Sequence, residues 1–136
     1  MPRQGREIWR YDPKIRDELA LQHLTCRGVS YHDARWPGAT AAVGGDCPQR
    51  IITATNDARL IALDAHTGRP CRSFGTNGTI DLRPTEQNYN GGWFQFTSAP
   101  LVTRGLIVVG GAIFDNAAVH MPVSYTHLTL PTNREV

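Results

Sequence analysis

Two pairs of short apolar runs, each interrupted by a polar turn, constrain the fold of this 136-residue chain most strongly. In the first pair, β-branched residues lie on both sides of Asn56-Asp57, and in the second they lie on both sides of Arg104-Gly105. Such runs around a short polar turn are typical of β-hairpins. We therefore expect antiparallel hairpins over residues 50–64 and 99–111, with Arg59 and Arg104 solvated at their turns.

The spacing of these hairpins predicts a repeated architecture. They recur about 45 residues apart, and their strands are too short to stand alone, which favours a repeated antiparallel unit such as a propeller blade. A blade needs neighbours on both of its faces. The 13 glycines and 9 prolines also indicate many turns and an all-β fold. Residues 5–13 are expected to be a strand end followed by a proline turn, and only residues 16–24 have a loose helical spacing.

Composition and charge exclude several classes of protein. With 40% hydrophobic and 19% charged residues, the chain has the composition of an ordinary globular protein. No stretch approaches the ~20 apolar residues of a membrane helix, and the N-terminus lacks the pattern of a signal peptide. A net charge of +2 is too small to indicate nucleic-acid binding. The three cysteines do not settle the redox compartment.

The segment QHLTCRGVSYHDARW, residues 22–36, concentrates chemically capable side chains. His23, Cys26 and His32 could suggest zinc, but structural zinc sites need four ligands at close spacings, and Cys26 has no CxxC partner. Cys26 as a nucleophile would need a base and an orienting group, which sequence proximity does not establish. A polar loop with solvated or hydrogen-bonded histidines is the third interpretation.

Residues 62–68, ALDAHTG, form a motif of the type Ala-x-Asp-x-x-Thr-Gly. This motif resembles the docking turn that closes each blade in quinoprotein dehydrogenase propellers. Asp64 and Thr67 can satisfy backbone groups of a tight turn, and Gly68 can adopt the positive φ that ends it.

A partial second copy of the motif precedes the first. Residues 5–9, GREIW, resemble its tail, in which a tryptophan four residues after the glycine wedges between blades. Trp9 has this spacing from Gly5. In the copy at residues 62–68 the corresponding position is Arg72, so the sequence departs from the pattern there.

Five segments extend the resemblance over residues 5–121: HLTCRGVSYH, CPQRII, NDARLIALDAHTG, TSAPLV and VVGGAIFDN. Their order resembles that in membrane-bound, PQQ-dependent glucose dehydrogenases and their quinate/shikimate relatives. The resemblance implies an eight-bladed propeller on the periplasmic face of the bacterial inner membrane. Residues 1–122 would be a fragment of about one and a half blades, without the N-terminal membrane anchor of the family.

The resemblance also implies a set of cofactor-binding residues. PQQ is a flat tricyclic o-quinone with three carboxylates, and in the family the histidine and arginine of H-x-T-C-R-G approach it. His23 would supply a hydrogen-bond donor and Arg27 a permanently charged fork. Thr97 would lie near a PQQ carboxylate, and the equal alternative is that it only opens a strand. Asp115 and Asn116 would occupy a family loop after the next strand, where the alternative is a simple turn.

The implied reaction is oxidation of a sugar or polyol, with glucose the leading substrate and quinate or shikimate as alternatives. A Ca²⁺ or Mg²⁺ ion assists PQQ in the family, and electrons pass to ubiquinone. We assign no catalytic base and no metal ligand within these residues, so the isolated chain is expected to be inactive. The alternative is a non-enzymatic propeller scaffold of the same repeat family that binds proteins at its rim. A scaffold has no reason to carry the His23–Arg27 loop together with Thr97.

Two further expectations concern the cysteines and the C-terminal residues. If the parent protein is periplasmic, Cys26 and Cys47 are expected to form a disulfide. Residues 123–136 resemble a translated sequencing adapter, which would make them a non-native tail with few contacts to the hairpins. The alternation in SYTHLTL also permits a genuine divergent strand.

Overall fold

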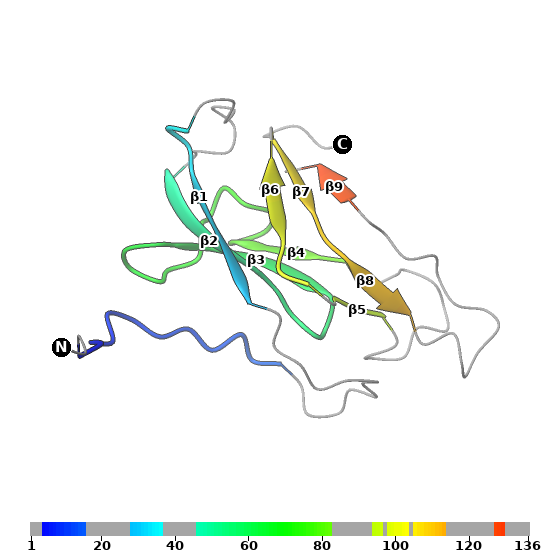
Figure 1. Cartoon of the computed structure of the whole chain (residues 1–136), viewed down its shortest axis with the longest axis horizontal. Helices are drawn as coiled ribbons and strands as arrows, with labels where there is room; N and C mark the ends of the chain where they lie inside the picture. The colour runs from blue at the N-terminus through cyan, green and yellow to red at the C-terminus, as the bar shows by residue number, and fades with distance from the viewer. Residues whose placement is uncertain are drawn as a thin grey trace.

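The computed structural model describes residues 4–15, 28–36, 46–82, 94–96, 98–103, 105–113 and 127–129, and these form strands, turns and loops without a helix (Figure 1). Strands β1 (Val29–Asp33), β2 (Gln49–Ala54), β3 (Arg59–Asp64) and β4 (Thr79–Asp81) form an antiparallel sheet in chain order. None of the described segments is a helix that could span a bilayer. The fold is thus all-β, as the sequence predicts.

The predicted hairpin over residues 50–64 is confirmed by β2 and β3. The ladder between them runs from Arg50↔Asp64 to Ala54↔Leu60. At the turn, Ala58 has a positive φ of 60° and its amide donates to the Thr55 carbonyl at 3.1 Å. The Thr55 hydroxyl accepts from the Arg59 amide at 3.1 Å, so local polar bonds close the turn.

The second predicted hairpin, over residues 99–111, is confirmed by β6 (Leu101–Thr103) and β7 (Leu106–Val108). Gly105 lies in the turn between these strands and has a φ of 78°, a conformation that favours glycine. Next to this hairpin, β5 (Phe94–Phe96) pairs with β8 (Gly111–Ile113). The second unit is therefore built from two small sheets.

The expectation that residues 123–136 make few contacts with the hairpins is wrong for β9 (His127–Thr129). This strand pairs antiparallel with β7, from Val108↔His127 to Leu106↔Thr129. It lies at the edge of a three-stranded sheet in the order β6-β7-β9. The alternation of SYTHLTL lets three of its residues complete the open edge of β7. The other residues of this segment lie outside the described ranges.

Residues 4–15 do not form the expected strand end. They run without regular secondary structure along the sheet β1–β4, and the Arg59 guanidinium donates to the Pro13 carbonyl at 2.5 Å. The helical spacing of residues 16–24 falls outside the described ranges.

The hydrophobic core joins the first sheet to the second unit. Ile52, Leu60 and Ala62 project from one face of β2 and β3 and are fully buried. They belong to one cluster with Ile107 and Val109, which are also buried. The other members are Cys47, Ala58, Cys71, Phe74 and Phe96. Neither hairpin could bury these side chains alone.

The disulfide links Cys47 to Cys71, not Cys26 to Cys47 as expected. The Cα atoms of Cys47 and Cys71 lie 5.6 Å apart, within the range that a disulfide bridges. The Cys71 amide donates to the Ala62 carbonyl at 2.9 Å, which places the segment after β3 back beside the sheet. Cys26 lies outside the described residues.

Trp9 docks onto the turn at residues 62–68. Its indole Nε1 donates to the Ala65 carbonyl at 3.0 Å, and a Cβ on Gly68 would lie only 2.5 Å from the indole ring. The Asp64 carboxylate accepts the amides of His66 at 2.8 Å and Thr67 at 3.0 Å. Gly68 has a φ of 72°, so the expected roles of Asp64 and Gly68 are both confirmed.

We expect Gly68→Ala to lower the free energy of unfolding by about 2 kcal/mol or more, because the methyl group meets Trp9 and the positive φ is strained. Gly5→Ala is the matched control, because a Cβ there meets nothing within 4 Å. Its effect should stay within about 0.5 kcal/mol. Urea denaturation measures both, and equal stabilities of the two variants would contradict the docking geometry.

Replacing Ile107 by Ala tests the packing between the two units. Ile107 is 1% exposed, so truncation should cost about 2 to 4 kcal/mol through lost burial and a cavity. Leu101→Ala removes a similar side chain that is 61% exposed and should cost far less. If thermal denaturation gives both variants the same midpoint, Ile107 does not join the units.

Candidate functional site

The five residues predicted to bind the cofactor lie outside the described residues: His23, Arg27, Thr97, Asp115 and Asn116. The structure does describe the backbone that directly follows two of these segments. Gly28 follows Arg27, and Ser98 follows Thr97. The contacts of these flanking residues therefore indicate how the two segments are anchored.

The start of β1 and the residues before β6 lie against each other. A Cβ on Gly28 would lie 3.8 Å from the Ala99 Cβ, and the Ser30 hydroxyl donates to the Pro100 carbonyl. Gly28 has a φ of 85°, so the chain turns sharply as it enters β1. Segments about 70 residues apart in sequence thus meet at one place, the entry to β1.

The ladder between β5 and β8 precedes the third predicted cofactor-binding segment, which contains Asp115 and Asn116. Phe96 pairs with Gly111, and Phe94 pairs with Ile113. Thr97 follows the first of these pairs, whereas Asp115 comes two residues after the second. The two segments therefore leave the ladder at opposite ends, and the ladder alone does not bring them together.

Residues 28–36 show how the remainder of the chemically rich segment is used. His32 on β1 is 6% exposed and pairs in register with Arg50 on β2. Burial lowers the pKa of His32, and the charge of Arg50 lowers it further. Its Nδ1 atom has no hydrogen-bond partner among the residues that the structure describes. Within the described ranges, no group of three potential ligands could hold a metal ion.

Arg50 is a buried cation that the sequence analysis did not single out. It is 2% exposed, and its Nε and Nη2 atoms donate to the Cys47 carbonyl at 3.1 and 3.0 Å. Burial lowers its pKa, while the charge of Asp46 opposes this effect. The period-2 alternation with Ile52 could have placed Arg50 on the buried face. Its hydrogen bonds to the Cys47 carbonyl hold the start of β2 in place.

Asp33 ends β1 with a structural ion pair. The Arg35 guanidinium approaches its carboxylate at 2.5 Å, and the Arg35 amide donates to it at 2.9 Å. These hydrogen bonds hold the pKa of Asp33 well below its usual range. Nearby, the rings of Tyr31 and Trp36 meet edge to face with centroids 5.5 Å apart.

Arg59 differs from the solvated side chain that was expected at its turn. Its Nε lies 2.7 Å from the Asp57 carboxylate, and its side chain is only 21% exposed. Its Nη2 atom also donates to the Pro13 carbonyl. Arg104 lies outside the described residues.

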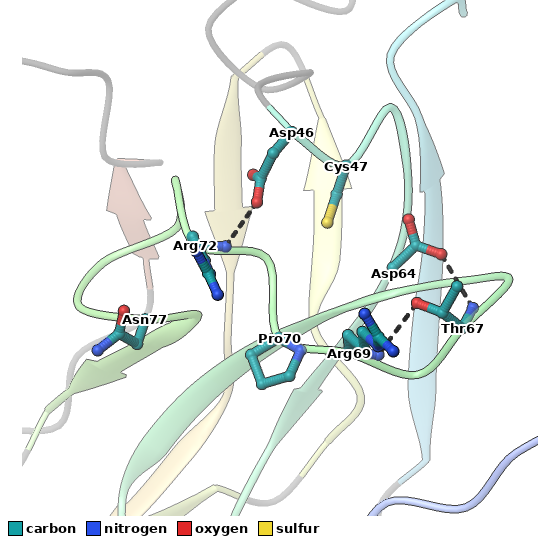
Figure 2. Close-up of a pocket in the computed structure, with 8 residues that line it drawn as sticks. All are labelled: Asp46, Cys47, Asp64, Thr67, Arg69, Pro70, Arg72 and Asn77. Atoms are coloured by element: carbon teal, nitrogen blue, oxygen red, sulfur yellow. Dashed lines mark hydrogen bonds between the residues drawn. The ribbon is translucent and has the colours of Figure 1, made fainter.

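A cavity of about 760 Å³ opens beside the docking turn (Figure 2). The residues that line it are Asp46, Cys47, Asp64, Thr67, Arg69, Pro70, Arg72 and Asn77. Asp64 pairs with Arg50, which pairs with His32, whereas Val29 pairs with Thr53. The cavity therefore lies at the end of the sheet opposite to Gly28.

Comparison with known proteins shows which family this chain resembles. Residues 1–126 match the family described as "PQQ: Glucose/ethanol/alcohol dehydrogenase, beta-propeller domain". The chain is 42% identical over 112 residues to the quinoprotein glucose dehydrogenase of Escherichia coli (strain K12), covering 82% of the chain and 14% of that protein. No solved structure matches the chain.

Two other relatives are also quinone-linked dehydrogenases by name. Identity is 46% over 120 residues with the quinoprotein glucose dehydrogenase of Gluconobacter oxydans (strain 621H), covering 85% of the chain and 15% of the relative. It is 38% over 130 residues with the quinate/shikimate dehydrogenase (quinone) of Acinetobacter baylyi (strain ATCC 33305 / BD413 / ADP1), covering 87% of the chain and 16% of the relative. The chain thus spans about a sixth of these proteins or less. With the family match over residues 1–126, these similarities show that the chain belongs to the β-propeller family of PQQ-dependent glucose, ethanol and alcohol dehydrogenases.

Proposed function

We propose that this chain is part of a longer PQQ-dependent dehydrogenase that oxidises a sugar or polyol, and that it contributes the first part of the cofactor pocket. The observation that supports this most is the contact of Gly28 and Ser30 with Ala99 and Pro100. It joins the backbone after the His23–Arg27 loop to the backbone after Thr97. Two polar segments anchored at one place suit a ligand with several carboxylates.

Each residue of the proposed pocket has a role that follows from its chemistry. The Arg27 guanidinium binds a carboxylate or quinone oxygen through charge-assisted hydrogen bonds. His23 donates a hydrogen bond, and the Thr97 hydroxyl donates to a carboxylate. Asp115 and Asn116 supply polar groups from the segment after β8.

When bound, PQQ supplies an electron-accepting quinone. The residues of this chain bind and orient that group, and a catalytic base and the ligands of Ca²⁺ or Mg²⁺ would come from other blades. We assign the electrons to ubiquinone and the enzyme to the periplasmic face of the inner membrane. Several relatives have names that point to glucose or quinate/shikimate as substrate. Glucose is the leading substrate, followed by quinate and shikimate.

The test uses the full-length enzyme. The apoenzyme is reconstituted with PQQ and Mg²⁺ or Ca²⁺, and its reduction of a ubiquinone analogue is measured with glucose, quinate and shikimate. Activity with one of them that requires PQQ supports the proposal. A correctly folded protein that neither binds PQQ nor oxidises any of the three, yet retains protein partners, would support the scaffold alternative.

The contribution of Arg27 can be measured separately. We expect Arg27→Ala in the full-length enzyme to weaken PQQ binding by about thirty- to a hundredfold, equivalent to about 2 to 3 kcal/mol for a charge-assisted bond. Removing the neutral donor in His23→Ala should cost less. The measurement is a PQQ titration of the apoenzyme by fluorescence quenching, with a melting curve to detect folding defects.

Arg69→Ala is the matched control, because Arg69 is exposed at the opposite end of the sheet. Arg59 is unsuitable because its ion pair with Asp57 and its bond to Pro13 contribute to the fold. Wild-type PQQ affinity in a folded Arg27→Ala protein would show that the loop is structural.

A further inference from the structure

The docking turn, residues 62–68, lies inside a covalent ring. The Cys47–Cys71 disulfide closes this ring across a sequence separation of 24 residues. Both cysteines are at most 3% exposed. The ring contains β2, β3 and the turn that receives the Trp9 indole. The disulfide therefore restricts the segment on which docking depends.

Backbone hydrogen bonds connect each cysteine to the turn. The Ala65 amide donates to the Gln49 carbonyl at 3.0 Å, and Gln49 is two residues from Cys47. The Asp64 amide donates to the Arg69 carbonyl at 2.8 Å, and Arg69 is two residues from Cys71. Ala65 also accepts the Trp9 indole. Each cysteine is thus two residues away from a backbone hydrogen bond to the turn, on Ala65 itself or on the adjacent Asp64.

Asp46 forms a second, non-covalent bridge beside the disulfide. Its carboxylate accepts the Arg72 amide at 2.8 Å, the Ser73 amide at 3.2 Å and the Ser73 hydroxyl at 2.6 Å. Figure 2 shows the bond from the Arg72 amide to the Asp46 carboxylate among the residues that line the cavity. Arg72 occupies the position that Trp9 has in the preceding copy of the motif. In this copy, the position of the tryptophan is occupied by Arg72, whose amide binds Asp46 in the same blade.

We propose that the Cys47–Cys71 disulfide is a redox-sensitive lock on the docking turn, which holds the turn in the shape that receives Trp9 and releases it when reduced. A dithiol reductant would break the S–S bond by thiol–disulfide exchange. Each cysteine sulfur gains one electron and one proton, and the reductant becomes a disulfide. Cys47, which is 3% exposed, lines the cavity of about 760 Å³, so the reductant would approach from the side of Cys47.

The experiment compares the oxidised and dithiothreitol-reduced forms of the full-length protein by hydrogen exchange and mass spectrometry. Alkylation and peptide mapping verify the state of Cys47 and Cys71. We expect exchange of the amides of residues 65–68 to accelerate about thirtyfold on reduction, equivalent to about 2 kcal/mol. Amides of β7 should accelerate less, because β7 lies outside the ring and shares only the hydrophobic core with the two cysteines.

Variants separate this lock from other thiol effects. Cys47→Ser/Cys71→Ser should show the fast exchange at residues 65–68 without reductant and no further response to it. Cys26→Ser should respond like the wild type. Unchanged exchange after verified reduction, equal acceleration in β7, or a peptide map without the Cys47–Cys71 link would each overturn the proposal. These results do not depend on PQQ binding, so they are independent of the proposed function.

Discussion

A sheet with two apolar faces is the constraint on which this structure depends. In β3, Leu60 and Ala62 project to one face and Ile61 and Leu63 to the other, and all four are buried. Such a sheet cannot be stable alone, because water would contact one face or both. Ile107 and its neighbours cover the first face, and the segment that carries Trp9 lies against the turn that ends β3. The contacts between repeats are therefore part of the fold itself.

The sequence predicted those parts of the fold that local chemistry determines. Both hairpins were predicted because β-branched runs and their turn residues are adjacent in the chain. The disulfide was not, because Cys47 and Cys71 become neighbours only through the pairing of β2 with β3 and the return of the chain beside Ala62. A strand within SYTHLTL was kept only as an alternative, and its pairing with β7 was not predicted, because the two segments are not adjacent in the chain.

The candidate site likewise combines residues that local motifs predict with contacts that they do not predict. The identities of His23, Arg27 and Thr97 came from motifs, each of which spans a few residues. Their anchoring depends on a contact between units, in which Ser30 donates to Pro100 across 70 positions of sequence. No local pattern encodes such a contact. Arg50 was overlooked because a charged residue in a strand is usually exposed, whereas here the Cys47 carbonyl satisfies part of its guanidinium.

The register of His32 opposite Arg50 has a consequence for acid tolerance. Both side chains are buried, so a proton on His32 would add a second positive charge beside the first. The folded protein therefore holds His32 neutral, with a pKa below the ordinary 6.5, whereas the unfolded chain binds the proton more readily. Stability from this pair is complete above pH 6.5 and declines as the pH falls toward the folded pKa. The strand that follows the proposed cofactor loop thus becomes the acid-sensitive edge of its blade.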